Sequence, residues 1–87
     1  MSTFTAQILT PDGALFEGEV NGVQMPGSQG SFEVKANHAP IVSTLEEGNV
    51  LVRKADGDVN YSISGGFVEV NNNKLTLLAE SVVKEEA

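Results

Sequence analysis

The chain has 87 residues, twelve acidic against five basic side chains, a net charge of −7 and no cysteine. This length suits one domain, and the missing cysteines exclude disulfides, thiolate zinc sites and cysteine nucleophiles. The basic residues are scattered rather than gathered in a stripe, which argues against nucleic acid and anionic lipid as direct partners.

The N-terminal part alternates extended segments with turn signals. Alternate residues over 4–10 are apolar, which predicts a half-buried strand closed by the turn Pro11-Asp12-Gly13. Extended structure resumes at 15–17. Within 19–25, the dipeptide Asn21-Gly22 fits either a two-residue hairpin or a bulge in one continuous strand, and the residues alone leave both open.

The stretch from Pro26 to Leu45 concentrates glycines, two prolines and the only histidine. Gly27 and Gly30 predict a loop bent sharply between two strands, because glycine reaches backbone angles closed to other residues. Pro40 favours an extended conformation at the residue before it, so His38 lies on a stiff, non-helical segment. Such a loop pair is suited to contact with a partner.

The remaining chain predicts further short strands joined by turns. The expected strands are 41–45, 49–54, 59–64, 67–70 and 74–79. The expected turns or breaks are Glu46-Gly48, Ala55-Asp58, Gly65-Gly66 and Asn71-Asn73. The tail over 80–87 could hold one helical turn but is too short for a stable helix.

About eight or nine short strands with turns roughly every 8 to 12 residues predict an all-β fold, an antiparallel β-sandwich or flattened barrel. The side chains expected in the core are Phe4, Ile8, Phe32, Val34, Val50, Val52, Tyr61, Ile63, Phe67, Leu75 and Leu77. Truncating one of them, as in Phe67→Ala, should remove a large part of a stability of roughly 4–13 kcal/mol.

Catalytic and metal sites find little support. His38 has possible triad partners in nearby serines and glutamates, but no glycine-flanked nucleophile is present and the domain is small for a water-excluding pocket. One histidine without cysteine is a poor basis for a zinc site, and residues 26–30 lack the ending of a phosphate loop. We expect a binding or assembly module without catalytic residues, metal or cofactor.

Two blocks of residues closely resemble the epsilon-subunit family of rotary F-type ATP synthases. These blocks are Asn37-His38-Ala39-Pro40-Ile41-Val42 and Ile63-Ser64-Gly65-Gly66-Phe67-Val68-Glu69-Val70. Further matches, from Ile8-Leu9-Thr10-Pro11 to Leu75-Thr76-Leu77-Leu78-Ala79-Glu80, extend the resemblance over nearly the whole chain. It implies a β-sandwich of about ten strands over 1–80, with Asn21-Gly22 inside a strand or bulge. Residues 81–87 are then a short tail, where family members commonly continue into two inhibitory helices.

The resemblance also implies a non-catalytic rotor role without the helical brake. In this family the epsilon subunit binds the gamma subunit and the ring of c subunits, which couples proton-driven rotation to ATP synthesis. We therefore expect a peripheral protein on the cytoplasmic face of a bacterial inner membrane, touching the membrane only through the complex. The residues implied to face the ring are Gly27, Ser28, Gln29, Gly30 and Ser31. The residues implied to face gamma are Thr10, His38, Ala39, Pro40 and Ser43.

Some positions depart from the family pattern. Glu33, Lys35 and Ala36 replace a glycine, an apolar residue and a proline, and Ser31 takes a position that is acidic in some members. The first three changes predict a more charged and less rigid ring-side surface, and the change at Ser31 bears on which group of the ring would be its charge partner. Two other hypotheses rest on composition: a free-standing β-sandwich that binds a small ligand, and a small hydrolase built on His38.

Overall fold

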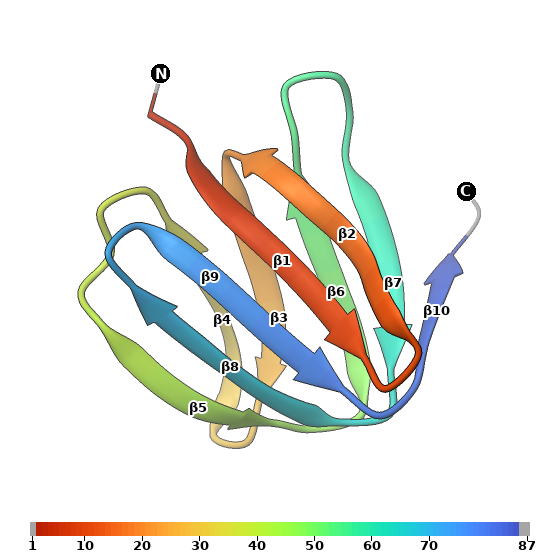
Figure 1. Cartoon of the computed structure of the whole chain (residues 1–87). Coiled ribbons are helices and arrows are strands. Elements are labelled where there is room, and N and C mark those ends of the chain that lie inside the picture. The colour runs from red at the N-terminus through yellow and green to blue at the C-terminus, as the bar shows by residue number, and fades with distance from the viewer. Residues whose placement is uncertain (1, 86–87) are drawn as a thin grey trace.

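The computed structural model describes residues 2–85, which form ten strands (Figure 1). The strands are β1 (Phe4–Thr10), β2 (Gly13–Val20), β3 (Gly22–Gly27), β4 (Gly30–Lys35), β5 (Ile41–Leu45), β6 (Gly48–Arg53), β7 (Val59–Ile63), β8 (Gly66–Asn71), β9 (Lys74–Ala79) and β10 (Val82–Glu85). That range contains no helix, and hence no helix long and apolar enough to cross a membrane. The all-β prediction is confirmed.

The strands build two facing layers joined at one corner (Figure 1). One layer has the order β10-β7-β6-β3-β4, and the other has the order β5-β8-β9-β1-β2. The layers join where Gly27 of β3 pairs with Leu45 of β5. Neighbouring strands are antiparallel except for β1 and β9, which run parallel and are connected through the rest of the chain rather than by a hairpin. The predicted β-sandwich is therefore confirmed, with one parallel pair inside it.

The core lies between the layers and is made of alternate residues of each strand. Most of the predicted core side chains are buried there, with Val50, Val52, Leu75 and Leu77 fully shielded from solvent. Phe32 is only partly buried, because β4 and β5 are not paired and leave its edge of the sandwich open.

Phe67 corrects the predicted core. The register of β8 against β9 places Val68 opposite Leu77 and Phe67 opposite Leu78. Val68 therefore faces the core, with no exposed surface, whereas Phe67 faces outward and is 39% exposed. The buried residues of β8 are Val68 and Val70, which sequence analysis left out of the core.

The connection between β2 and β3 answers the question left open at Asn21-Gly22. The hairpin alternative is wrong, because β2 pairs with β1 whereas β3 pairs with β4 and β6. The chain instead bends at Asn21 and passes from one layer to the other. Its backbone N–H donates to the carbonyl oxygen of Arg53 at 2.7 Å, which fixes the bend against β6.

The C-terminal segment also differs from expectation. Residues 82–85 form a strand rather than a helical turn, and Val82 pairs with Ile63 of β7. The backbone N–H of Ser64 donates to the carbonyl oxygen of Ser81 at 3.2 Å and leads the chain into this pairing. The edge of β7 was otherwise unpaired, and β10 satisfies its backbone groups. The role of 81–87 as a link to further structure stays a prediction.

The opposite orientations of Leu77 and Phe67 give a direct test of the fold. We expect Leu77→Ala to lower the free energy of unfolding by about 2–5 kcal/mol, because it leaves a cavity in the core. Phe67→Ala should cost about 1 kcal/mol or less, because the ring already contacts solvent. Urea denaturation of both variants measures the difference, and equal losses would contradict the register of β8.

Candidate functional site

The five residues implied to face the ring form one hairpin between β3 and β4. Gly27 pairs with Gly30 across the two-residue turn Ser28-Gln29. Gly30 has φ of +123°, a conformation open to glycine and strained for other residues. A Cβ atom on Gly27 would lie 2.7 Å from the carbonyl oxygen of Gly30 and 2.7 Å from the Phe32 ring. The tightness of this turn therefore depends on both glycines.

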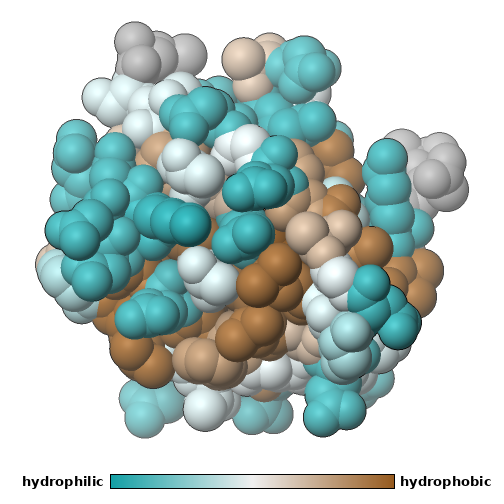
Figure 2. Space-filling model, in the orientation of Figure 1, coloured by the Kyte–Doolittle hydropathy of each residue, from teal (hydrophilic) through white to brown (hydrophobic). Residues whose placement is uncertain are grey.

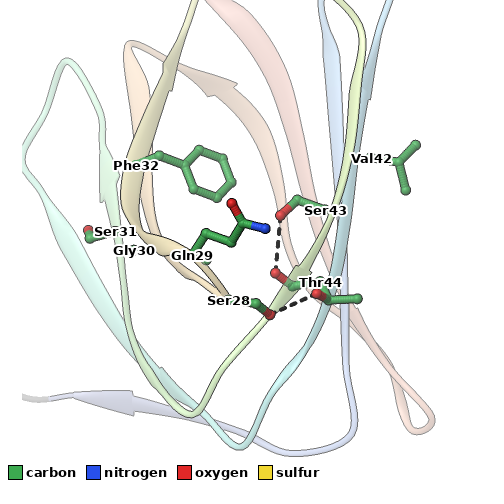
Figure 3. Close-up of a pocket in the computed structure, with 9 residues that line it drawn as sticks. Ser28, Gln29, Gly30, Ser31, Phe32, Val42, Ser43 and Thr44 are labelled. Carbon is green, nitrogen blue, oxygen red and sulfur yellow. Dashed lines mark hydrogen bonds between the residues drawn. The ribbon is translucent and has the colours of Figure 1, made fainter.

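This hairpin faces β5 across a shallow, open hollow (Figure 3). The hydroxyl groups of Ser28 and Thr44 lie 2.7 Å apart and bridge its two sides. Gln29 and Phe32 extend toward β5, whereas the Val42 side chain points to the opposite side of that strand (Figure 3). The lining residues are Gly27, Ser28, Gln29, Gly30, Ser31, Phe32, Val42, Ser43 and Thr44. None of them is charged, so the hollow is a neutral surface of hydroxyl, amide and apolar groups.

Ser43 belongs to this hollow although sequence analysis assigned it to gamma. Its hydroxyl donates to the carbonyl oxygen of Thr44 at 3.1 Å, on the side of β5 that the hairpin faces. The structure thus brings Ser43 together with the residues implied to face the ring. Pairing between β3 and β5 at Gly27 and Leu45 is the cause of this proximity.

His38, Ala39 and Pro40 are exposed on the connection between β4 and β5. The histidine Nδ1 lies 2.7 Å from the carbonyl oxygen of Ala39. A carbonyl oxygen can only accept, so the ring donates Nδ1–H to it, and in the neutral imidazole Nε2 is then the acceptor. None of the possible triad partners engages the ring within the described chain. This arrangement suits recognition of a donor on a partner.

Thr10 lies at the opposite end of β1 from this connection. Its hydroxyl donates to the carbonyl oxygen of Gly13 at 3.2 Å and accepts the backbone N–H of Asp12 at 3.2 Å. These bonds close the turn between β1 and β2. Thr10 also borders a second shallow hollow that contains Phe67 and Leu78. The structure therefore does not bring Thr10 next to His38, which lies on the connection between the two layers.

An outer apolar patch, which sequence analysis missed, covers part of that layer. We define it as Leu9, Val42, Phe67 and Leu78. Phe67 pairs with Leu78, and Leu78 pairs with Leu9, so these three lie in a row across β8, β9 and β1. Figure 2 views this face and shows apolar surface running across it. Phe67 is 39%, Leu78 37% and Val42 71% exposed. The two-residue alternation of β8 and β9 was the signal that could have revealed it.

The outer face of the other layer carries an ion pair instead. The Arg53 Nε atom lies 2.7 Å from the Glu33 carboxylate, and the Arg53 Nη1 atom lies 3.5 Å from Asp58. Gly22 of β3 leaves room for it, since a Cβ atom there would lie 2.7 Å from the Glu33 carboxylate oxygen. The charge that Glu33 adds to this surface is therefore paired with Arg53 across β3.

Two titratable groups, Glu19 and Tyr61, have shifted pKa values, and neither lines the hollows described above. Hydrogen bonds from the hydroxyls of Thr5, at 2.7 Å, and Thr3, at 2.9 Å, lower the pKa of Glu19, which lies on β2. Burial raises the pKa of Tyr61. Over residues 2–85, no three side chains of His, Asp or Glu are grouped closely enough to hold a metal ion.

Comparison with known proteins gives the same family from a family model and from individual relatives. A family model described as "ATP synthase, Delta/Epsilon chain, beta-sandwich domain" matches residues 3–85. An ATP synthase epsilon chain of Caulobacter vibrioides is 43% identical over 84 residues, covering 97% of this chain and 98% of the relative. One of Chlorobaculum tepidum is 42% identical over 80 residues, with 91% of each chain covered. One of Salinibacter ruber is 40% identical, but the match spans only 58% of that longer relative.

Solved structures share the fold. A chain of the Euglena gracilis mitochondrial ATP synthase (OSCP/F1/c-ring, rotational state 1) superposes with a TM-score of 0.90 at 23% identity, covering 97% of this chain and 54% of that one. A chain of the Tetrahymena thermophila mitochondrial ATP synthase central stalk/c-ring gives 0.79 at 15% identity, covering 91% and 64%. At these identities the likeness establishes the fold alone.

The close contacts around Gly27 generate a prediction for the hairpin. Gly27→Ala should lower the free energy of unfolding by about 1–3 kcal/mol, because the new methyl group forces the turn and the Phe32 ring apart. Ser28→Ala is the matched control, removes only the contact with Thr44, and should cost about 1 kcal/mol or less. Urea denaturation measures both, and a Gly27→Ala loss no larger than that of Ser28→Ala would contradict the geometry.

Proposed function

The chain belongs to the ATP synthase delta/epsilon-chain β-sandwich family, and from that premise we propose that it is a non-catalytic subunit of the rotor. In this role it binds gamma in the central stalk and the ring of c subunits, and couples proton-driven rotation to ATP synthesis. The solved neighbours come from ATP synthases described with a c-ring, which supports this role. The proposal assigns both contacts to the sandwich itself and requires no helices.

The observation that carries the proposal is the outer apolar patch. Exposed apolar clusters on small soluble domains commonly mark protein interfaces, because water leaves them on association. Two of the residues implied to face gamma border the patch: Thr10 shares a hollow with Phe67 and Leu78, and Pro40 shares another with Val42. We propose that gamma covers this face, with Thr10 and the His38-Pro40 segment at its margins.

Acidic side chains beside the outer apolar patch indicate the charge to expect on the partner surface. Glu80 lines the hollow that contains Phe67, and Glu69 lines the hollow that contains Pro40. An apolar centre with acidic side chains beside it is complemented by an apolar surface with basic residues around it. We expect the facing surface of gamma to have that character.

The neutral hollow beside the β3–β4 hairpin is the proposed contact with the ring. Its hydroxyl and amide groups can donate and accept hydrogen bonds, and Gly30, where an added Cβ atom would meet nothing within 4 Å, permits close approach of another backbone. A polar loop without an apolar centre fits such a surface. We assign Gly27, Ser28, Gln29, Gly30 and Ser31 to this contact and add Ser43 as their neighbour. Membrane association, on the cytoplasmic face in a bacterium, then follows from the ring and requires no lipid contact.

Gamma binding tests the role of the patch. The chain should form a complex with gamma from its own source that elutes together in gel filtration at micromolar concentration. Phe67→Ser should weaken this complex at least about tenfold, as expected when an apolar interface anchor is removed. Val83→Ser is the matched control, because Val83 is 59% exposed on β10 of the other layer. Failure of the unmodified chain to bind gamma, or equal effects of the two substitutions, would overturn the assignment.

Ring binding is tested separately by adding one charge to the neutral hollow. Gln29→Glu keeps the side-chain shape but introduces a carboxylate that a polar loop must desolvate, so the complex with gamma should bind the purified ring about tenfold more weakly. Asn60→Asp adds the same charge at an exposed position of β7 and should leave ring binding unchanged. Gamma binding by both variants should equal that of the unmodified chain. Equal ring affinities for the two variants would contradict this placement.

A further inference from the structure

Asn73 connects three segments that are distant in the sequence. Its side-chain Oδ1 accepts the backbone N–H of Asn37 at 2.7 Å, and its Nδ2 donates to the carbonyl oxygen of Thr3 at 3.3 Å. Its own carbonyl oxygen accepts the backbone N–H of Thr5 at 3.3 Å. The β8–β9 turn is thereby tied to the start of the chain and to the connection between β4 and β5.

The turn itself explains why this asparagine can reach so far. Asn72 and Asn73 have φ of +52° and +61°, the left-handed conformations of a two-residue hairpin that asparagine tolerates well. Both residues therefore supply left-handed backbone to the turn. Of these two asparagines, only Asn73 forms side-chain hydrogen bonds with other residues in the range 2–85. The side-chain function of Asn73 is separable from its backbone function.

Asn37 is the residue at which the chain leaves β4 for the exposed segment His38-Ala39-Pro40. Its φ of +63° marks a bend in the backbone. One hydrogen bond, from the backbone N–H of Asn37 to the Asn73 side chain, holds this bend. The segment that follows is exposed along its length, and the histidine bond to Ala39 is internal to it. The hydrogen bond to Asn73 thus fixes the start of this segment to the sandwich.

We propose that Asn73 is a positioning residue for partner binding: its side chain holds Asn37, and through it His38 and Pro40, in the conformation that docks. This inference rests on the proposed function, in which that segment lies at the margin of the gamma contact. A segment held before docking loses less conformational freedom when it binds. Losing one hydrogen bond of this kind should weaken gamma binding about 3- to 10-fold.

Three substitutions separate the side chain from the turn. Asn73→Gly retains the left-handed backbone and removes both side-chain bonds. Asn72→Gly is the matched control, with the same backbone change and no side-chain bond to lose. Asn73→Asp keeps the oxygen that accepts the Asn37 N–H. We expect amide exchange at Asn37 in the free protein to be about tenfold faster in Asn73→Gly alone, since a bond of about 1.4 kcal/mol corresponds to that factor.

Calorimetric titration with gamma then gives the functional readout. Asn73→Gly should bind about 3- to 10-fold more weakly, while Asn72→Gly and Asn73→Asp bind as the unmodified chain does. In a His38→Ala background, Asn73→Gly should have a smaller effect, because the group that it positions has been removed. A purely structural role would give equal effects in both backgrounds.

The outcomes distinguish this inference from the proposed function. Absence of gamma binding by the unmodified chain overturns the proposed function. Normal binding by that chain, with Asn73→Gly equal to Asn72→Gly in exchange or in affinity, overturns only the positioning role. The positioning role is also overturned if the Asn37 amide exchanges as fast in Asn73→Asp as in Asn73→Gly, because the accepting oxygen would then not be what protects that amide.

Discussion

The corner at which β3 meets β5 is the constraint on which the rest of the molecule depends. There the backbone N–H of Glu46 donates to the carbonyl oxygen of Pro26 at 2.7 Å, and that of Ser28 donates to the carbonyl oxygen of Thr44 at 3.2 Å. These bonds join the two layers into one folded sheet and close the core at that end. They also set the β3–β4 hairpin against β5. The hollow proposed to contact the ring is therefore a direct product of the bonds that hold the sandwich together.

The two layers have different outer faces, so the two sides of the molecule are suited to different contacts. Across β4, β3 and β6 the outward residues are mostly polar, with Leu51 and Pro26 as apolar exceptions, and the charge of Glu33 is paired with that of Arg53. Across β8, β9 and β1 the outward residues include the outer apolar patch. Burial of such a patch is favourable and that of a polar face is nearly neutral, so one layer is suited to a stable partner. The hairpin, at the end of the sandwich, remains free for a second contact.

Much of this architecture could be predicted from the sequence. Alternation over residues 4–10 gave β1 with its bounds, and the asparagines at 71–73 gave the β8–β9 hairpin, because both signals are local. The features that sequence analysis predicted wrongly or missed depend on contacts between distant parts of the chain. Phe67 was assigned to the core because its own segment does not reveal which of two faces is buried; the register against β9 decides that. Strand β10 was missed because so short a segment becomes a strand only when it pairs with the edge of β7.

The candidate site divides in the same way. Residues 27–31 could be expected to form one hairpin, since two glycines define the turn. The position of Ser43 beside this hairpin, and the hydrogen bond between Asn73 and Asn37, could not be predicted. Both depend on contacts between residues 16 or more positions apart. The same holds for the row formed by Leu9, Leu78 and Phe67, whose members come from three strands.

The central claim is that gamma covers the outer face of β8, β9 and β1, and amide hydrogen exchange of the chain with and without gamma tests it most directly. Binding should slow exchange at Phe67, Glu69 and Leu78, whereas amides on the opposite layer, such as Asn60, should exchange at the same rate in both states. Slower exchange confined to β6 and β7, with Phe67 and Leu78 unaffected, would contradict the account.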